Sequence, residues 1–136
     1  MPLSSIETIC QSWAPRLLSL LRIIVGLLFI EHGTSKFFGF PSGGETGTVE
    51  LFSLIGLSGA LELVGGVLLT LGLFTRITAF ILSGEMAFAY FIAHAPHSFF
   101  PLLNHGEPAV FYCFLFLYVA AAGPGPWSID NALRWR

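Results

Sequence analysis

The chain has 136 residues, of which 54% are hydrophobic and only 10% are charged, and its mean hydropathy is +0.78. A small soluble domain exposes much of its surface and carries roughly 25% charged residues. The composition therefore excludes an ordinary water-soluble domain, and its apolar content excludes an intrinsically disordered chain. A net charge of −2 without a basic stripe argues against nucleic-acid binding. Cys10 and Cys113 lie far apart, so neither a disulfide framework nor a redox pair is expected.

Four apolar stretches approach the length that a membrane-spanning helix requires, about 20 residues. They cover residues 17–38, 49–73, 76–93 and 108–123. Their apolar residues follow one another without the alternation of a membrane barrel strand, so helices are predicted. We therefore expect an all-α fold, a four-helix membrane bundle in which residues 1–136 form a single domain. No cleavable signal peptide is expected, because the opening residues lack a basic segment and the first apolar stretch is too long.

Residue types at the ends of these stretches predict where helices begin. Pro15 and Pro108 are typical of the first turn of a helix. Apolar residues at helical spacing predict a short interfacial helix over residues 3–14, and Ser128 is expected to cap another helix near the C-terminus. Between the second and third spans, Gly72–Arg76 leaves room only for a tight hairpin.

Four spans place both termini on one side of the membrane, and the positive-inside rule predicts that this side is the cytoplasm. Arginines and tryptophans gather at this boundary: Arg16, Arg22, Arg76, Arg134, Arg136, Trp13, Trp127 and Trp135. Lys36 is the single lysine or arginine predicted on the opposite side. The expected location is the cytoplasmic membrane, with several spans in contact with membrane lipids.

Two glutamates are predicted near the middle of the membrane, where an ionisable side chain costs on the order of 3 kcal/mol. With a rise of about 1.5 Å per residue, Glu62 on the second span and Glu85 on the third both lie roughly 14–15 Å from the cytoplasmic edge. Each must face the bundle or a cavity, and the two are candidates for one buried site. The alternative is that these carboxyl groups only hold helices together.

The first span carries two cations on the face that also holds its glycines. Arg22 and Lys36 share this face with Gly26, Phe29 and Gly33, all within about 40° of one another at 100° per residue. Because two desolvated carboxylates cannot both ionise without a nearby cation, either residue could set the charge of the glutamate pair. For Arg22 a second alternative stays open, in which it reaches the cytoplasmic headgroups as a topology anchor.

The four histidines fall toward the outer side. His94 and His97 have i, i+3 spacing at a helix end, and His105 or Glu107 could complete a metal site with them. Alternatively, one of the histidines, with His32 as a candidate, hydrogen-bonds a quinone carbonyl or relays its proton, since imidazole titrates near neutral pH. A histidine without any ligand at the interface is the third interpretation.

Five motifs follow one another along the chain: Arg22-Ile-Ile-Val-Gly26, Glu31-His-Gly-Thr-Ser-Lys36-Phe-Phe-Gly39, Glu62-Leu-Val-Gly-Gly66, Gly72-Leu-Phe-Thr-Arg76 and Gly123-Pro-Gly-Pro-Trp-Ser-Ile-Asp130. In this order and spacing they resemble the DoxX family of small four-helix membrane proteins, over nearly the whole chain. The resemblance implies a link to the membrane subunit of thiosulfate:quinone oxidoreductase. It also marks the positions that match recurrent polar sites of the family, namely Arg22, His32, Lys36, Glu62, Arg76, Glu85, Glu107 and Asp130.

The resulting hypothesis is a membrane subunit of redox metabolism that binds a quinone or quinol between the first three spans. The candidate catalytic residues are Glu62, Glu85, Arg22 and Lys36, and the candidate cofactor-binding residues are His32, Glu62, Glu85 and Arg76. Cysteines for an iron–sulfur cluster or a haem are lacking, so oxygen reduction would need a partner subunit. The alternative is a non-catalytic scaffold for partner proteins, or a homo-oligomer, in which the intramembrane charges only pack helices.

Overall fold

A computed structural model describes residues 4–42 and 49–134, and every regular element within these residues is helical. The elements are α1 (Ser5–Phe38), α2 (Leu54–Leu71), α3 (Thr75–Ala89), the π-helical segment η1 (Tyr90–His94), α4 (Pro101–Asn104), α5 (Glu107–Ala122) and α6 (Ile129–Arg134). The all-α prediction is confirmed. Helices α1, α2 and α3 with η1 are long and apolar enough to cross a membrane, and α5 is a shorter apolar helix.

Helix α1 is longer than predicted. The short helix expected over residues 3–14 is not a separate element, because Ser5–Phe38 is one helix of 34 residues with Pro15 inside it; residue 3 lies outside the described part. A capping box starts the helix: the Ser4 hydroxyl accepts from the Glu7 N–H at 3.3 Å, and the Glu7 carboxylate accepts from the Ser4 N–H at 2.7 Å. Pro15 removes one backbone hydrogen-bond donor from the helix. The helix nevertheless continues through it, because the cap stabilises the part before Pro15 and packing on α2 stabilises the part after it.

Other predicted boundaries shift by a few residues. Helix α2 begins at Leu54 instead of residue 49, because the Ser53 hydroxyl caps it by accepting from the Gly56 N–H at 3.0 Å. The third span continues through the π-helical turn to His94. Helix α5 starts with Pro108 in its first turn, as predicted, whereas α4 is a short helix in a segment expected to be a loop.

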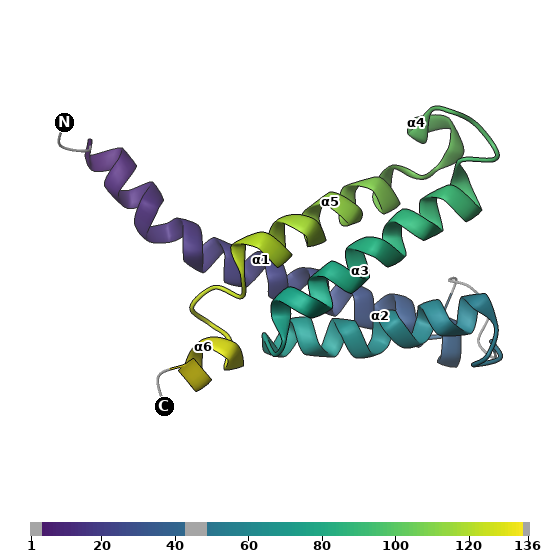
Figure 1. Cartoon of the computed structure of the whole chain (residues 1–136), viewed down its shortest axis with the longest axis horizontal. Helices are drawn as coiled ribbons and strands as arrows, with labels where there is room; N and C mark the ends of the chain where they lie inside the picture. Colours follow the sequence, from purple (N-terminus) through teal and green to yellow (C-terminus); the bar gives the residue numbers. More distant parts are fainter. Residues whose placement is uncertain (1–3, 43–48, 135–136) are drawn as a thin grey trace.

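The helices form two antiparallel pairs (Figure 1). Helix α1 packs along α2 and α3 packs along α5, whereas α2 and α3 contact each other much less. The first pair is close because of its glycines: a Cβ added to Gly26 would lie 2.8 Å from the Gly66 carbonyl oxygen, and one added to Gly66 would lie 2.7 Å from that of Gly26. The small-residue faces of these two spans are therefore used for packing inside the chain.

Phe29 of α1 connects the two pairs. Its ring centroid lies 5.1 Å from that of Tyr112 and 4.7 Å from that of Phe116, both on α5, in edge-to-face geometry. Within the second pair, the Ser83 hydroxyl of α3 donates to the Cys113 carbonyl of α5 at 2.7 Å. Cys113 is half-buried and Cys10 is exposed, and both thiols are free, as predicted.

One end of the molecule holds the α2–α3 hairpin and both termini, and we call it the hairpin end (Figure 1). Arg22 closes it: the guanidinium is fully buried and donates to the backbone carbonyls of Leu69, Thr70, Pro124 and Trp127. Gly72 has a φ of +68°, and a Cβ there would lie 2.9 Å from Arg22 Cζ, so only glycine lets the hairpin pass over the guanidinium. Arg22 thereby fastens the C-terminal segment to the end of α2.

Arg76 and Ser128 also stabilise the hairpin end. Arg76 donates to the carbonyls of Ala120, at 2.9 Å, and Ala121, where its charge complements the C-terminus of α5. The Ser128 hydroxyl caps α6 as predicted, accepting from the Asn131 N–H at 3.1 Å. Helix α6 and the α2–α3 hairpin thus lie together at this end, while a common membrane side for the two termini stays a prediction. That this end faces the cytoplasm stays a prediction, and Trp135 and Arg136 lie outside the described part.

Asp130 of α6 caps α3 from another part of the chain. Its two carboxylate oxygens accept from the N–H groups of Phe74 and Thr75, each at 2.9 Å. Partial burial alone would raise the pKa of Asp130, but the hydrogen bonds from Thr75 and Phe74 outweigh it and hold the pKa below its ordinary value of 3.8. The ionised carboxylate therefore stabilises the hairpin end.

We expect Asp130→Ala to lower the free energy of unfolding by about 1 kcal/mol, as the loss of an N-cap usually does. Because the pKa of Asp130 is lowered in the folded protein, its contribution is present above the ordinary pKa and is lost as the pH falls through the lower, folded-state value. Thermal unfolding in lipid nanodiscs over a pH series should show this loss in the wild type and not in the variant. Equal pH dependence of both proteins would contradict the role of the cap.

Candidate functional site

A cavity of about 770 Å³ lies between the two helix pairs. Its lining comes from the C-terminal half of α1, the N-terminal half of α2, the second half of α3 with η1, and the start of α5. These are the parts of the helices away from the hairpin end, where the two pairs diverge (Figure 1). The limited contact between α2 and α3 leaves this space open.

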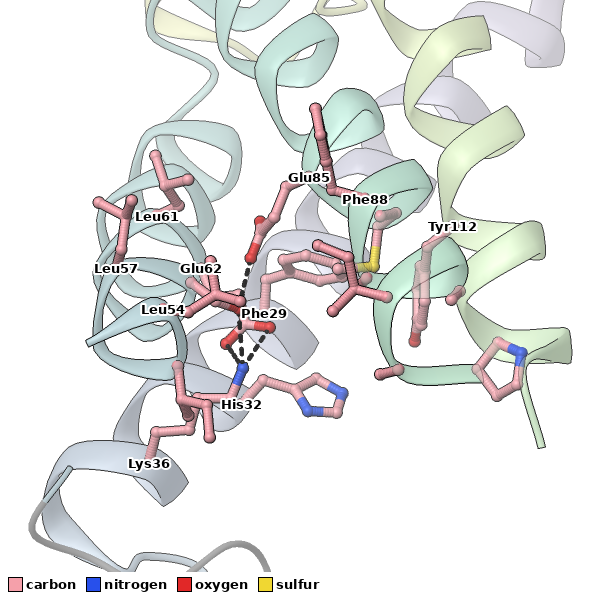
Figure 2. A pocket seen from close by; sticks show the side chains of 18 of the residues that line it. Phe29, His32, Lys36, Leu54, Leu57, Leu61, Glu62, Glu85, Phe88 and Tyr112 are labelled. Atoms are coloured by element: carbon pink, nitrogen blue, oxygen red, sulfur yellow. Dashed lines mark hydrogen bonds and ion pairs between the residues drawn. The ribbon is translucent and has the colours of Figure 1, made fainter. Parts of the chain in front are cut away.

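Four polar side chains form a chain of hydrogen bonds in the cavity (Figure 2). Lys36 Nζ lies 2.9 and 2.8 Å from the two carboxylate oxygens of Glu62 and donates to the Ser58 hydroxyl at 3.0 Å. Ser58 in turn donates to Glu85 Oε1 at 2.7 Å. Glu62 and Glu85, predicted as candidates for one buried site, thus line the same cavity, and Lys36 and Ser58 link them.

The polar chain ends on an unpartnered atom. Glu85 Oε2 is buried and has no hydrogen-bond partner among the described residues. Buried polar oxygens are almost always paired, so this one needs a hydrogen-bond partner that the described residues do not supply. The cluster holds one amine and two carboxyl groups, which lie side by side in the cavity.

Apolar side chains form the rest of the cavity. Phe29 and Tyr112 present rings on the inner side (Figure 2), and Met86 of α3 also lines the cavity. At the rim, Leu57 of α2 and Phe88 of α3 are 57% and 71% exposed on the surface that faces lipid in a spanning bundle. The cavity therefore opens sideways between α2 and α3, toward the membrane interior.

Two histidines also line the cavity. His32 lies against Phe29, with ring centroids 5.9 Å apart, and it sits one turn before Lys36 on α1. His94 Nδ1 lies 2.9 Å from the Asn104 carbonyl oxygen. Because a carbonyl only accepts hydrogen bonds, His94 Nδ1 is the donor of this bond. His32, a predicted cofactor-binding residue, thus lines the same cavity as Glu62 and Glu85.

The structure does not bring the two predicted arginines into this site. Arg22 and Arg76 are both held by backbone carbonyls at the hairpin end. Of the two alternatives for Arg22, pairing with Glu62 or Glu85 is not observed, and neither is simple exposure to headgroups. Instead its charge is satisfied inside the fold, because the ends of α2 and α5 direct unpaired carbonyls toward it.

The structure does not bring the histidines of the possible metal site together. No three His, Cys, Asp or Glu side chains come together as a ligand set anywhere in residues 4–42 and 49–134. The i, i+3 rule fails for His94 and His97 because the helix ends in a π-helical turn at His94. His97 and His105 are exposed and do not line the cavity, and Glu107 borders a separate shallow hollow.

Sequence reasoning missed three residues that shape the site. Ser58 is not among the predicted site residues, although its place one turn before Glu62 could have indicated a shared partner. Tyr112 carried no signal beyond its apolar surroundings. Asn104 is buried and donates to Ser98 O at 2.9 Å and accepts from the Gly106 N–H at 2.8 Å, so it organises the loop that holds His94.

The family model for DoxX matches residues 17–95, more than half of the chain. The chain belongs to the DoxX family. The matched range of this DoxX protein includes the whole polar cluster and both arginines of the hairpin end. The predicted family resemblance is therefore confirmed.

Similar DoxX-like relatives come from several bacteria. An uncharacterized protein of Haemophilus influenzae is 46% identical over 127 residues, 89% of this chain and 93% of the relative. The "Putative oxidoreductase CatD" of Bacillus subtilis is 46% identical over 65 residues, which cover 43% of this chain and 45% of CatD. The inner membrane protein YqjF of Escherichia coli is 29% identical over 128 residues, 83% of this chain and 88% of YqjF. No solved structure matches the chain. The relatives and the apolar helices together make this DoxX protein a multi-pass membrane protein.

Proposed function

We propose that this DoxX protein binds a quinone or quinol in the cavity between its helix pairs and acts as a membrane subunit of redox metabolism. The observation that carries the proposal is the unpartnered Oε2 of Glu85, buried in a cavity with mostly apolar walls. A ligand that meets it must combine a polar oxygen with a large apolar body. The name of CatD, a relative over part of the chain, points to the same class of chemistry.

The shape of the cavity supports a ring with an apolar tail. Its volume of about 770 Å³ falls within the usual range of small-molecule sites. The rings of Phe29 and Tyr112 offer edges and faces for an aromatic head group. The exposed apolar rim between Leu57 and Phe88 lets a tail remain in lipid. Entry from the membrane favours a lipid-soluble ligand over a soluble metabolite.

A bound quinone would supply a couple in which two electrons and two protons convert it to the quinol. Glu85 would hold a ring oxygen through Oε2, and His32 is placed to meet polar atoms near Lys36. Ser58 connects Glu85 to the Lys36–Glu62 pair, so a proton on Glu85 has a hydrogen-bonded neighbour on the protein side. The chain has two cysteines, too few for a four-cysteine iron–sulfur cluster, so a partner protein would exchange the electrons.

Glu85→Gln is expected to weaken the binding of a short-chain quinol about tenfold or more, because hydrogen bonds to a charged group contribute roughly 1.5–3 kcal/mol. Gln keeps the size of the side chain, so the Lys36–Glu62 pair should stay intact. Binding is measured by calorimetry on purified protein in nanodiscs, with Glu107→Gln, outside the cavity, as the matched control. A wild-type protein that binds no quinone or quinol would contradict the proposal.

The same variants separate this function from the scaffold alternative. If the site binds ligand, Glu85→Gln loses quinol affinity while the thermal midpoint and any co-purifying protein stay unchanged. If Glu62 and Glu85 serve only to assemble partners, Glu62→Gln and Glu85→Gln lose the co-purifying protein. In that case neither the wild type nor the variants bind quinol.

A further inference from the structure

Helix α1 is longer than a membrane needs. Its 34 residues correspond to about 51 Å, whereas the hydrocarbon core is about 30 Å thick. Between Arg16 and Lys36 it has an apolar run that crosses roughly 28 Å at about 1.5 Å per residue. The segment from Ser5 to Arg16 therefore continues beyond the apolar run, and Figure 1 shows it extending away from the other helices. Every residue of this projecting segment is exposed.

An apolar stripe follows α1 along its exposed side, and we call it the α1 seam. It consists of Ile6, Cys10, Trp13, Leu17, Leu20, Ile24 and Leu27, all exposed. Their spacing alternates between four and three residues, which is the heptad pattern of paired helices. Arg22, Gly26 and Phe29, which α1 buries in its own bundle, lie on the opposite side of the helix. The next position of the pattern is Glu31, so the seam ends at Leu27.

The part of the α1 seam that lies in the projecting segment is the evidence that another surface covers the seam. Within the membrane, lipid covers any apolar face, so exposure there needs no partner. In the projecting segment, however, Ile9 flanks the seam as a further exposed apolar residue, and the far side of the helix carries Glu7, Thr8, Gln11 and Ser12. Ile6 and Trp13 are 73% and 51% exposed on a helix that is amphipathic only in this part. Exposing apolar area to water costs about 25 cal/mol per Å². Burial of this part of the seam against another surface is therefore favourable.

We propose that the α1 seam is a homodimer interface, in which a second copy of this chain pairs with it in parallel. Copies inserted in one membrane share one orientation, so a symmetric pair of α1 helices is parallel and in register. The heptad pattern then places each seam residue against its equivalent. No charged residue lies on the seam between Ile6 and Leu27, so self-pairing brings no like charges together. Exposed Gln11 and Ser12 remain outside the pair.

This dimer leaves the cavity accessible. The cavity opens between α2 and α3, whereas the seam lies on the side of α1 away from its own bundle. The proposal is thus independent of quinone binding, and either can fail without the other.

Cys10 allows a direct test of the proposal. In Cys113→Ser protein in native membranes, oxidation or a short bis-maleimide is expected to join Cys10 of two copies. The control, Cys10→Ser with Gln11→Cys in the same background, moves the thiol one residue to the polar side and should cross-link about tenfold less. Cys10→Ser with Leu17→Cys restores a seam position and should cross-link again. Equal cross-linking at residues 10 and 11, or cross-linking of Cys10 to a different protein, would overturn the proposal.

A second measurement tests the association without cysteine chemistry. Ile6→Lys with Cys10→Lys places charges on the seam and is expected to weaken dimerisation about tenfold or more, measured by energy transfer between labelled copies on dilution in lipid. Thr8→Lys with Ser12→Lys adds the same charges to the polar side and should leave it unchanged. All four positions are exposed, so folding is expected to persist. Wild-type protein that stays monomeric, including one whose projecting segment instead lies on the lipid surface, would refute the dimer.

Discussion

Lys36→Met is expected to lower the free energy of unfolding by about 3–5 kcal/mol, because it leaves the Glu62 carboxylate buried without its cation. Lys36 Nζ contacts both oxygens of Glu62 within 2.9 Å, and the two side chains are only 14% and 5% exposed. Breaking a buried pair costs more than the pair contributes, since the remaining charge has lost both water and its partner. Thermal unfolding in nanodiscs and the yield of folded protein measure the effect.

The double variant Lys36→Met with Glu62→Leu is the matched control. It removes both charges, so most of the stability lost in the single variant should return. Ser58 loses its donor in both variants, and the chain of hydrogen bonds from Glu85 then ends at Ser58. We therefore expect weak quinol binding even when the double variant is stable. A single variant as stable as the wild type would show that Glu62 needs no cation.

Arg22→Met is expected to lower the free energy of unfolding by about 3 kcal/mol or more, because each buried carbonyl left unsatisfied costs roughly 1–3 kcal/mol. Four carbonyls accept from this guanidinium; that of Leu69 also accepts from the Gly72 N–H, whereas those of Pro124 and Trp127 belong to the C-terminal segment. That segment should detach from the end of α2 and become sensitive to protease. Limited proteolysis and thermal unfolding measure these two effects.

Arg16→Met provides the control for Arg22, since Arg16 is exposed on α1 and its removal should change stability by no more than about 0.5 kcal/mol. The position of Arg22 away from the cavity adds a second expectation: the folded fraction of Arg22→Met should bind quinol as well as the wild type. If the variant were stable and protected from protease but lost quinol binding, Arg22 would act at the ligand site as the sequence analysis predicted.

The two intramembrane glutamates show how far a sequence can locate a site. The helical rise places Glu62 and Glu85 at the same depth, and the cost of a charge in lipid requires both to face inward. These two facts make the residues candidates for one buried site, and the structure places both on one cavity. They do not predict the hydroxyl that connects the two carboxyl groups, because Ser58 is also small enough to be a packing residue, and only the rotation of α2 against α3 decides which role it has.

The arginines and histidines mark the limit of the same reasoning. Arg22 shares its helix face with Lys36, yet the two side chains meet different parts of α2, with carbonyls at its C-terminal end and a carboxylate near its middle. His94 and His97 have metal-ligand spacing, but a π-helical turn and the Asn104 carbonyl change where the imidazoles lie. In both cases the partner comes from a distant part of the chain.

By itself the sequence determined the membrane as the solvent and the helical class, and it predicted a common side for the termini and a shared depth for two carboxyl groups. These follow from local quantities: apolar length, rise per residue and the cost of charge in lipid. Only the tertiary structure decided that the helices form two diverging pairs, that Lys36 and not Arg22 serves Glu62, and that a cavity opens between them. The reason is that hydrogen bonds and helix packing pair groups far apart in the chain, and no spacing along one helix specifies them.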